Sequence, residues 1–210
     1  MENKFKTNIL PKKQKNLFEF LSAQKWLDTF YLAGGTALAL QIGHRRSIDF
    51  DFFTKTSFDR KEIIRNMTKY GTFELFTEGA DTLHGSLNGV QISFFRLEDK
   101  LLQKTTGNKH LHVAGTLDIA AMKLNAISGR GTKKDFIDLY FLMREFALPE
   151  LFKGYESKYG RSVSNNYHLL KSLTYFGDAE KQPMPKMLVA VSWNHVKESI
   201  ISLVKNEHIF

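Results

Sequence analysis

The sequence predicts an α+β protein in which an α/β half is followed by an all-helical half. Between residues 72 and 97 three segments alternate apolar and polar residues, which is the spacing of β-strands. From residue 116 onward apolar residues recur at helical spacing instead, in segments over 117–128, 134–144, 149–159, 165–175 and 193–205. The change near residue 115 predicts one domain over 1–115 and a helical domain over 116–210.

The first half is expected to contain further elements before its three alternating segments. These are a helix over 13–29, a strand over 30–33, a helix over 36–42, a strand over 48–53 and a capped helix that ends at Lys69. Asn88 and Gly89 form a dipeptide that favours two-residue hairpin turns, so the strands on either side of it are expected to pair.

The composition excludes several classes of protein. The chain has 210 residues, 42% of them hydrophobic and 25% charged, which is ordinary for a globular protein. It has no cysteine, so disulfides and thiolate chemistry are excluded. No stretch approaches the ~20 apolar residues that span a bilayer, and the first residues do not resemble a signal peptide. We therefore expect a cytoplasmic protein without a membrane partner.

The charge balance indicates a polyanionic partner. The net charge is +8 and the sequence pI is about 9.5. A basic surface attracts nucleic acid, and binding of that kind weakens steeply as salt rises. Charge alone does not decide this, because many basic proteins bind no nucleic acid.

A glycine-rich turn precedes the predicted helix over 36–42. Gly34, Gly35 and Thr36 follow a short apolar strand, and a turn at a helix N-terminus presents main-chain N–H groups to an anion such as phosphate. The Thr36 hydroxyl could contact the phosphate or cap the helix. The plain alternative is that the glycine pair only forms a tight turn.

Two carboxylates lie one residue apart in the predicted strand over 48–53. Alternate strand residues face the same side, so Asp49 and Asp51 would repel each other unless a cation lies between them. Oxygen ligands of this kind suit Mg²⁺ with bound phosphates. The plain alternative places both aspartates on an edge strand facing solvent, with Ile48, Phe50 and Phe52 packed inward. Ser47 belongs either to this site or to the preceding loop.

Further charged residues allow two interpretations each. Arg45 and Arg46 are either surface charges or positioned where a triphosphate would project. Lys123 lies at the edge of an apolar helix stripe, so it either reaches water or enters a cleft between the two halves and binds phosphate. Asp135 and Asp138 are neighbours on one helix face, where a carboxylate near the N-terminus ordinarily complements the helix dipole.

Four segments together resemble the AbiEii/AbiGii nucleotidyltransferase toxins of the polymerase-β-like nucleotidyltransferase superfamily. They are Leu32-Ala-Gly-Gly-Thr-Ala-Leu-Ala-Leu, Gly43-His-Arg-Arg-Ser-Ile-Asp-Phe-Asp-Phe-Phe, Met122-Lys-Leu-Asn-Ala-Ile and Lys134-Asp-Phe-Ile-Asp-Leu-Tyr-Phe-Leu. They span about residues 30–145 in the order of that family.

The resemblance implies a minimal nucleotidyltransferase fold, a mixed sheet flanked by helices, followed by a helical C-terminal domain. It implies Mg²⁺, a nucleoside triphosphate substrate and transfer of a nucleoside monophosphate to an acceptor hydroxyl, in some relatives at the tRNA 3′ end. It also implies a toxin of an abortive-infection or toxin–antitoxin pair, with a cognate antitoxin protein as partner.

The same resemblance assigns roles by position. Asp49 and Asp51 would hold the metal, Ser47 would match the family's Ser-x-Asp, Lys123 would contact the triphosphate and Asp135 would be a further catalytic acid. The nucleotide-binding positions would be Gly34, Gly35, Thr36, Arg46, Ser47 and Lys123.

One departure concerns the general base. Many superfamily members carry a third carboxylate on a later strand, but the segment over 90–95 offers Gln91 and Ser93 there. Either Asp135 or Asp138 compensates, or the base is absent. Two other functions therefore stay open: transfer to a protein or small molecule, and an inactive nucleotide-binding module.

Overall fold

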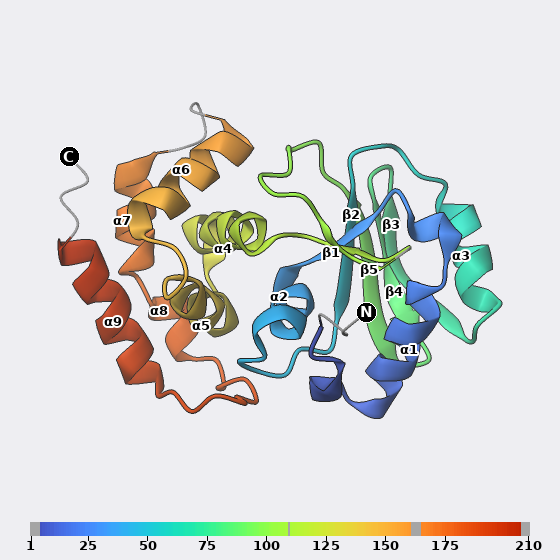
Figure 1. The fold of residues 1–210 in the computed structure, drawn as a ribbon, viewed down its shortest axis with the longest axis horizontal. Coiled ribbons are helices and arrows are strands. Elements are labelled where there is room, and N and C mark those ends of the chain that lie inside the picture. Colours follow the sequence, from blue (N-terminus) through green and yellow to red (C-terminus); the bar gives the residue numbers. More distant parts are fainter. Residues whose placement is uncertain (1–4, 109, 161–164, 207–210) are drawn as a thin grey trace. The chain divides into compact units, whose positions relative to one another are not determined.

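The structure is a computed structural model that describes residues 5–108, 110–160 and 165–206. These residues form two compact units. Unit 1 contains the described parts of 1–42, 47–99 and 105–114, and unit 2 contains those of 43–46, 100–104 and 115–210 (Figure 1). Unit 1 is built on a mixed sheet with helices and unit 2 is helical, so the predicted α+β class is confirmed.

Unit 1 holds a mixed sheet with the strand order β3-β4-β5-β2-β1-β7-β6. Its strands are β1 (Tyr31–Ala33), β2 (Phe50–Thr54), β3 (Phe73–Gly79), β4 (Thr82–Leu87), β5 (Val90–Arg96), β6 (Thr106–Gly107) and β7 (His112–Val113). Strand β2 runs antiparallel to β1 and parallel to β5. The hairpin between β4 and β5 turns at Asn88 and Gly89, both with positive φ, as the sequence predicts.

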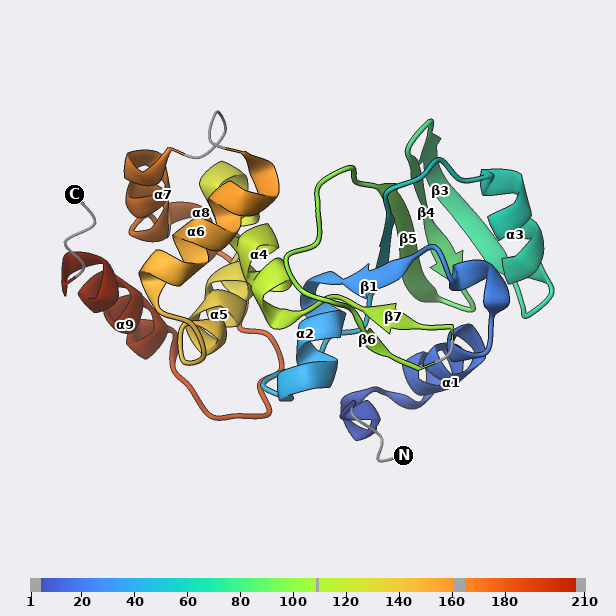
Figure 2. The same ribbon diagram turned by 45° about the horizontal axis from the view of Figure 1, so that its top comes forward.

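The sheet differs from the prediction at three points. The short strands β6 and β7 continue it beyond β1 (Figure 2), where only the stretch around His110 and His112 looked strand-like in the sequence. Strand β2 begins at Phe50 rather than at Ile48, and Ile48 is 47% exposed, so the alternative interpretation that packs it inward is wrong for Ile48. Strand β2 also lies between β1 and β5, which rules out the edge-strand interpretation of its aspartates.

The first helix of unit 1 is shorter than predicted. Helix α1 (Lys12–Ser22) ends before residue 29 and is followed by a 3₁₀ turn over Lys25–Leu27. The Ser22 hydroxyl donates to the Phe18 carbonyl, and the Gln24 side-chain amide donates to the Phe20 carbonyl. The main-chain N–H groups of Ala23 and Gln24 donate to the carbonyls of Phe20 and Leu21, so carbonyls of the last helical turn are satisfied and the helix can stop there.

Aromatic residues on one face of the sheet form the core of unit 1. Phe18 of α1 stacks on Phe50 of β2, and Phe52 of β2 stacks on Phe94 of β5. Helices α1 and α3 (Arg60–Thr68) lie on one side of the sheet and α2 (Gly34–Ile42) on the other (Figure 1). The Asp59 carboxylate caps α3 by accepting from the N–H groups of Lys61 and Glu62. The aromatic face leaves the opposite face of β2 available for polar side chains.

Unit 2 is a group of helices around α4 (Thr116–Arg130). Helix α4 packs on α5, α6 and α7, and α5 packs on α9. The remaining helices are α5 (Lys133–Leu142), α6 (Leu148–Tyr159), α7 (Asn166–Leu173), α8 (Gly177–Glu180) and α9 (Trp193–Asn206). Helix α8 was not predicted. None of the helices described is long and apolar enough to cross a membrane.

A buried ion pair joins the segment 100–104 to the helices of unit 2. The Asp118 carboxylate accepts from the N–H groups of Leu102 and Gln103, and it binds Lys158 Nζ at 2.9 Å. Both charged side chains are fully buried. Lys158 also donates to the Lys100 carbonyl. The Asp118–Lys158 pair therefore holds the loop over 100–104 against the helices of unit 2.

Candidate functional site

The turn between β1 and α2 brings a glycine against a carboxylate. Gly34 has φ +72°, a conformation that residues with side chains rarely adopt. A Cβ placed there would lie 3.2 Å from Oδ2 of Asp51. The antiparallel pairing of β1 with β2, with Ala33 opposite Asp51, produces this approach. The carboxylate therefore lies at the start of α2, where main-chain N–H groups of the first helical turn favour an anion.

Asp49 and Asp51 lie on either side of a buried residue. Phe50 is fully buried, whereas both aspartates are half-buried. The Thr36 hydroxyl, itself buried, donates a short hydrogen bond to the main-chain carbonyl of Asp49. This bond uses the one proton of the Thr36 hydroxyl and ties the first turn of α2 to the start of β2. Ser47 is half-buried in the same unit.

The two carboxylates form a donor set that suits Mg²⁺. Among the residues described, no group of three or more histidine, aspartate or glutamate side chains could hold a metal. Mg²⁺ is commonly held by one or two carboxylates together with substrate phosphates and water. The carboxylates of Asp49 and Asp51 are ligands of the type that Mg²⁺ prefers, and that of Asp51 lies beside a helix N-terminus.

Strand β5 offers no carboxylate beside Asp51. Ser93 of β5 is the register partner of Asp51, so the two residues are adjacent on neighbouring parallel strands. Ser93 is buried, and Gln91 two residues before it is exposed. Strand β5 therefore places a hydroxyl, and no carboxylate, next to Asp51.

Unit 2 contains a second cluster, centred on the carboxylate of Asp138. His44 Nε2 lies 2.7 Å from Oδ1, and Lys123 Nζ lies 2.8 Å from Oδ2. Arg45 donates from Nε to Oδ1 at 2.6 Å and from Nη2 to Oδ2 at 2.7 Å. All four residues are buried. One buried anion thus gathers three basic side chains.

These contacts determine the charges within the cluster. Burial by itself disfavours the charged form of Asp138, but Lys123, Arg45 and His44 outweigh it and hold the pKa of Asp138 well below its usual range. Burial also opposes the charge of Lys123, and Asp138 with Asp135 raises the pKa of Lys123 all the same. Burial lowers the pKa of His44 despite the bond to Asp138. A neutral His44 next to an ionised Asp138 follows.

Asp135 acts as a helix cap as well as a partner of Lys123. Its Oδ1 binds Lys123 Nζ at 2.8 Å, and its Oδ2 accepts from the main-chain N–H and the hydroxyl of Thr132. This is a capping box at the start of α5, which matches the ordinary role expected for a carboxylate at this position. Lys123 is buried between Asp135 and Asp138 rather than extended to water.

The two arginines of the loop differ. Arg45 is buried, so its interpretation as a surface charge is wrong, and its guanidinium binds Asp138. Arg46 is exposed, and its main-chain N–H donates to the Lys186 carbonyl at 2.8 Å. Of the pair, only Arg46 presents its side chain to solvent.

The same network bears on the general base. A base must accept a proton near neutral pH, and a carboxylate with a strongly lowered pKa does so poorly. Asp138 is therefore unsuited to that role, and both oxygens of Asp135 already have partners. Neither residue compensates well for the missing third carboxylate.

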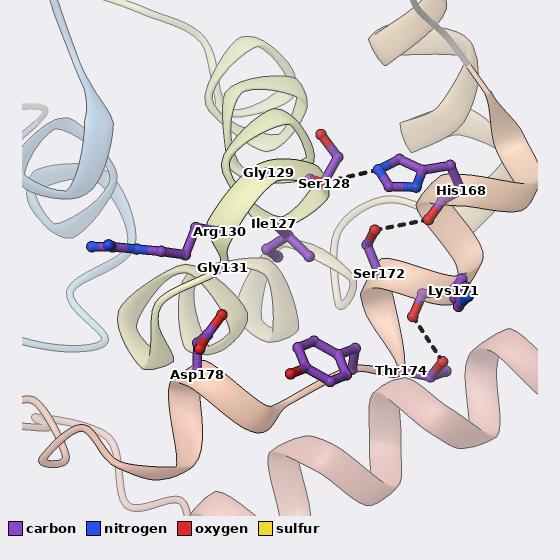
Figure 3. A pocket seen from close by; sticks show the side chains of 11 residues that line it. Ile127, Ser128, Gly129, Arg130, Gly131, His168, Lys171, Ser172, Thr174 and Asp178 are labelled. Carbon is purple, nitrogen blue, oxygen red and sulfur yellow. Dashed lines mark hydrogen bonds between the residues drawn. The ribbon is translucent and has the colours of Figure 1, made fainter.

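A hollow of about 470 Å³ lies elsewhere in unit 2, between the end of α4 and α7. His168 Nε2 lies 2.9 Å from the carbonyl oxygen of Ser128 at its edge, and Arg130 points away from its centre (Figure 3). It contains none of the site residues expected from the sequence, so its presence does not bear on their roles.

Comparisons with known proteins identify the family of this chain. Residues 16–108 match the family model described as nucleotidyl transferase AbiEii toxin, type IV toxin–antitoxin system. The protein aq_aa25 of Aquifex aeolicus (strain VF5) is 40% identical over 202 residues, which cover 93% of this chain and 96% of that protein. The chain belongs to the AbiEii nucleotidyltransferase toxin family. The matched region contains β1, α2 and β2, and therefore Gly34, Asp49 and Asp51.

Solved structures show that this family shares its fold with distant proteins. JHP933 from Helicobacter pylori has a TM-score of 0.56 at 14% identity, covering 93% of this chain and 92% of that one. MenT4, a nucleotidyltransferase toxin from Mycobacterium tuberculosis H37Rv, has a TM-score of 0.55 at 14% identity, covering 95% and 87%. At this identity the likeness concerns the fold alone.

The organisation of the Asp138 cluster could not be predicted from the sequence. His44 was not singled out, and Arg45 lies 93 positions from its partner. No spacing rule joins residues so far apart. The one available clue was the proximity of Asp135 and Asp138 to each other on a helix, which the shared contact with Lys123 confirms.

Proposed function

We propose that this chain transfers a nucleoside monophosphate from a nucleoside triphosphate to an acceptor hydroxyl of RNA, with the tRNA 3′ end as the expected acceptor. The observation that supports it most directly is the approach of the Asp51 carboxylate to Gly34 at the start of α2. A cation site and an anion site lie side by side there, as a metal–triphosphate substrate requires. Membership of the family supports the class of reaction.

The chain's own residues bind and orient the substrate in this proposal. Asp49 and Asp51 would hold Mg²⁺, which when bound neutralises phosphate charge and favours departure of pyrophosphate. Main-chain N–H groups of the turn from Gly34 to Thr36 hold phosphate oxygens, and Thr36 fixes Asp49 through its carbonyl. The acceptor oxygen forms a bond to the α-phosphorus, while the bond from that phosphorus to the bridging oxygen breaks.

Arg46, Lys123 and Ser47 have supporting roles in the same proposal. Arg46 is exposed and attracts the triphosphate, and Ser47 lies two residues before Asp49. Lys123 stays positively charged, because two carboxylates raise its pKa. Asp135 fixes Lys123 while it caps α5. The roles of Lys123 and Asp135 are therefore electrostatic.

The partners follow from the family and from the charge. A net charge of +8 favours RNA as the acceptor, with activity that falls as salt rises. A toxin of a type IV toxin–antitoxin system has a cognate antitoxin, which we propose as the protein partner in the cytoplasm.

The test measures transfer of label from each α-labelled nucleoside triphosphate in the presence of Mg²⁺ and total RNA. Wild type is compared with Asp51→Asn and with Glu19→Gln, which removes one charge from an exposed position of α1. Label in RNA with wild type and Glu19→Gln but not with Asp51→Asn is the expected result.

Other outcomes point to the alternatives. Label found in protein or in a small molecule would show that this molecule, and not RNA, is the acceptor. Binding of nucleotide without any transfer, unchanged in Asp51→Asn, would indicate an inactive binding module and would overturn the proposal.

A further inference from the structure

The hollow of about 470 Å³ between the end of α4 and α7 lies within unit 2. A hydrogen bond of 2.9 Å joins His168 Nε2 of α7 to the carbonyl oxygen of Ser128 in α4, so two of its walls are tied together (Figure 3). The buried side chain of Ile127 forms its floor. Ligand pockets commonly have volumes of about 300–1,000 Å³, so the hollow is large enough for one nucleotide.

An exposed tyrosine lines the hollow and rests against a glycine. Tyr175 follows α7 and is 65% exposed. The next residue, Phe176, packs on Phe136 and Trp193, which anchors this segment to α5 and α9. A Cβ placed at Gly177 would lie 2.6 Å from the Tyr175 hydroxyl oxygen and 2.8 Å from the ring carbon that carries it. A side chain at 177 would therefore displace the ring.

Two basic side chains and three hydrogen-bond acceptors line the same hollow. Arg130 and Lys171 are exposed, and Arg130 points away from the centre of the hollow (Figure 3). Asp178 contributes a carboxylate, while the hydroxyls of Ser172 and Thr174 donate their protons to main-chain carbonyls. The oxygens of these two hydroxyls are left as acceptors. The hollow thus combines an aromatic ring and acceptors with positive charge at its rim.

We propose that this hollow binds an unpaired guanine nucleotide of the RNA acceptor. The inference rests on the proposed function and names the part of the substrate that unit 2 recognises. The base stacks on Tyr175, as bases of single-stranded nucleic acid stack on aromatic side chains. Its N1–H and N2–H₂ groups donate to the Asp178 carboxylate, which can accept two parallel hydrogen bonds. The neighbouring phosphates extend to Arg130 and Lys171.

The chemistry of the lining favours guanine, and favours a strand over a free nucleotide. The Watson–Crick edge of guanine carries two donor groups side by side, whereas adenine, cytosine and uracil each carry one. The Asp178 carboxylate repels phosphate, so phosphate contacts belong at the rim, where the basic side chains are. A strand passes phosphates on both sides of the bound base, while a free nucleotide offers only its own.

The test measures binding of fluorescein-labelled RNA heptamers by anisotropy, without triphosphate or Mg²⁺. The heptamers consist of adenylate with guanine, inosine or adenine at the centre, and inosine lacks the N2 amino group. Wild type should bind the guanine heptamer at least about fivefold more tightly than the other two. It should bind the same heptamer at least about tenfold more tightly than GMP, measured by competition, because GMP lacks the flanking phosphates.

Three variants and one control test whether this binding occurs in the hollow. Tyr175→Ala should raise Kd about 5–100-fold through loss of stacking. Tyr167→Ala removes a similarly exposed tyrosine of α7 that does not line the hollow, and should change Kd less than about twofold. Gly177→Ala displaces the Tyr175 ring without removing it and should weaken binding with thermal unfolding unchanged. Asp178→Asn should reduce the preference for guanine to within about twofold.

A charge variant tests the rim of the hollow. Lys171→Gln should weaken binding and reduce the slope of log Kd against log salt concentration by about 0.7, as expected for the loss of one phosphate contact on a single strand. Lys153→Gln removes an exposed lysine of α6 outside the hollow and should leave the slope unchanged.

The outcomes separate the two proposals. Unchanged affinity in Tyr175→Ala overturns the site, as does equal weakening in Tyr167→Ala. Equal binding of the three heptamers overturns guanine as the ligand, and GMP that binds as tightly as the guanine heptamer overturns RNA as its source. Wild type that binds the guanine heptamer as expected but transfers no label to RNA overturns the proposed function, while the hollow remains an RNA-binding site.

Discussion

The guanidinium of Arg45 binds the carboxylate of Asp138 through two parallel hydrogen bonds of 2.6 and 2.7 Å. This two-point contact fixes both the distance and the plane of the arginine, which a single bond would not do. It attaches the four-residue segment 43–46 to α5 within unit 2. Arg46 follows Arg45 directly in the chain. Because Arg45 is held in place, the position of the Arg46 main chain is restricted as well.

Removal of the Asp138 carboxylate should be far more damaging than removal of that of Asp135. Asp138→Ala leaves Arg45 and Lys123 buried without their shared anion, at a cost of about 3–5 kcal/mol in the free energy of unfolding. Asp135→Ala removes a helix cap, worth about 1 kcal/mol, while Lys123 keeps Asp138. Urea unfolding at pH 7.5 measures both, and equal losses would contradict the central place of Asp138.

His44 should make the protein less stable in mild acid. Because its pKa is lowered in the folded state, the unfolded chain takes up the proton first as the pH falls below about 6.5. The stability that neutral His44 contributes is present above that pH and is lost on acidification. Urea unfolding at pH 7.5 and 5.5 should show a larger drop for wild type than for His44→Gln. An identical drop would show that His44 does not titrate in this way.

Arg45 and Arg46 should give opposite phenotypes. Arg45→Ala should lower the free energy of unfolding by about 3–5 kcal/mol, since it leaves a buried carboxylate short of a partner. Arg46→Ala should leave thermal unfolding unchanged, because its side chain is exposed, and should raise KM for the triphosphate several-fold. Thermal unfolding and initial-rate kinetics test the pair. Unchanged KM in Arg46→Ala would remove it from the nucleotide site.

Gly34 should be intolerant of any side chain. Gly34→Ala places a Cβ 3.2 Å from Asp51 Oδ2 and requires a left-handed backbone, which costs about 1–2 kcal/mol. We also expect at least a tenfold loss of nucleotide transfer, because Asp51 must move. Gly129→Ala is the matched control, since a Cβ there meets nothing within 4 Å and the residue is helical. Full activity of Gly34→Ala would show that the close approach has no catalytic value.

Thr36 should act through its hydroxyl rather than its shape. Thr36→Val keeps the volume but leaves the Asp49 carbonyl without its donor, at a cost of about 1–2 kcal/mol and with reduced kcat/KM. Thr36→Ser keeps the donor and should retain most of the activity although it loses a buried methyl group. If serine were worse than valine, packing and not the hydrogen bond would hold the geometry of this turn.

The sequence was a reliable guide to local features. Asn88 and Gly89 adopt the positive φ values of their hairpin turn, Asp59 caps α3, and the helices α4 to α7 and α9 lie where apolar spacing placed them. These features depend on a few neighbouring residues, so their physical causes are visible in the chain itself. The prediction was wrong where a helix gave way to a 3₁₀ turn, as after Ser22, or where strands of two residues show no periodicity.

The sequence by itself determined the α+β class, the glycine turn and the alternating aspartates, because backbone preference and side-chain period are local properties. Only the tertiary structure decided which residues meet: Asp51 against Gly34, Ser93 beside Asp51, and Arg45 with His44 around Asp138. Those pairings depend on strand order and on contacts between residues up to 94 positions apart. Strand order and long-range contacts follow from burying the whole core at once, which no short segment encodes.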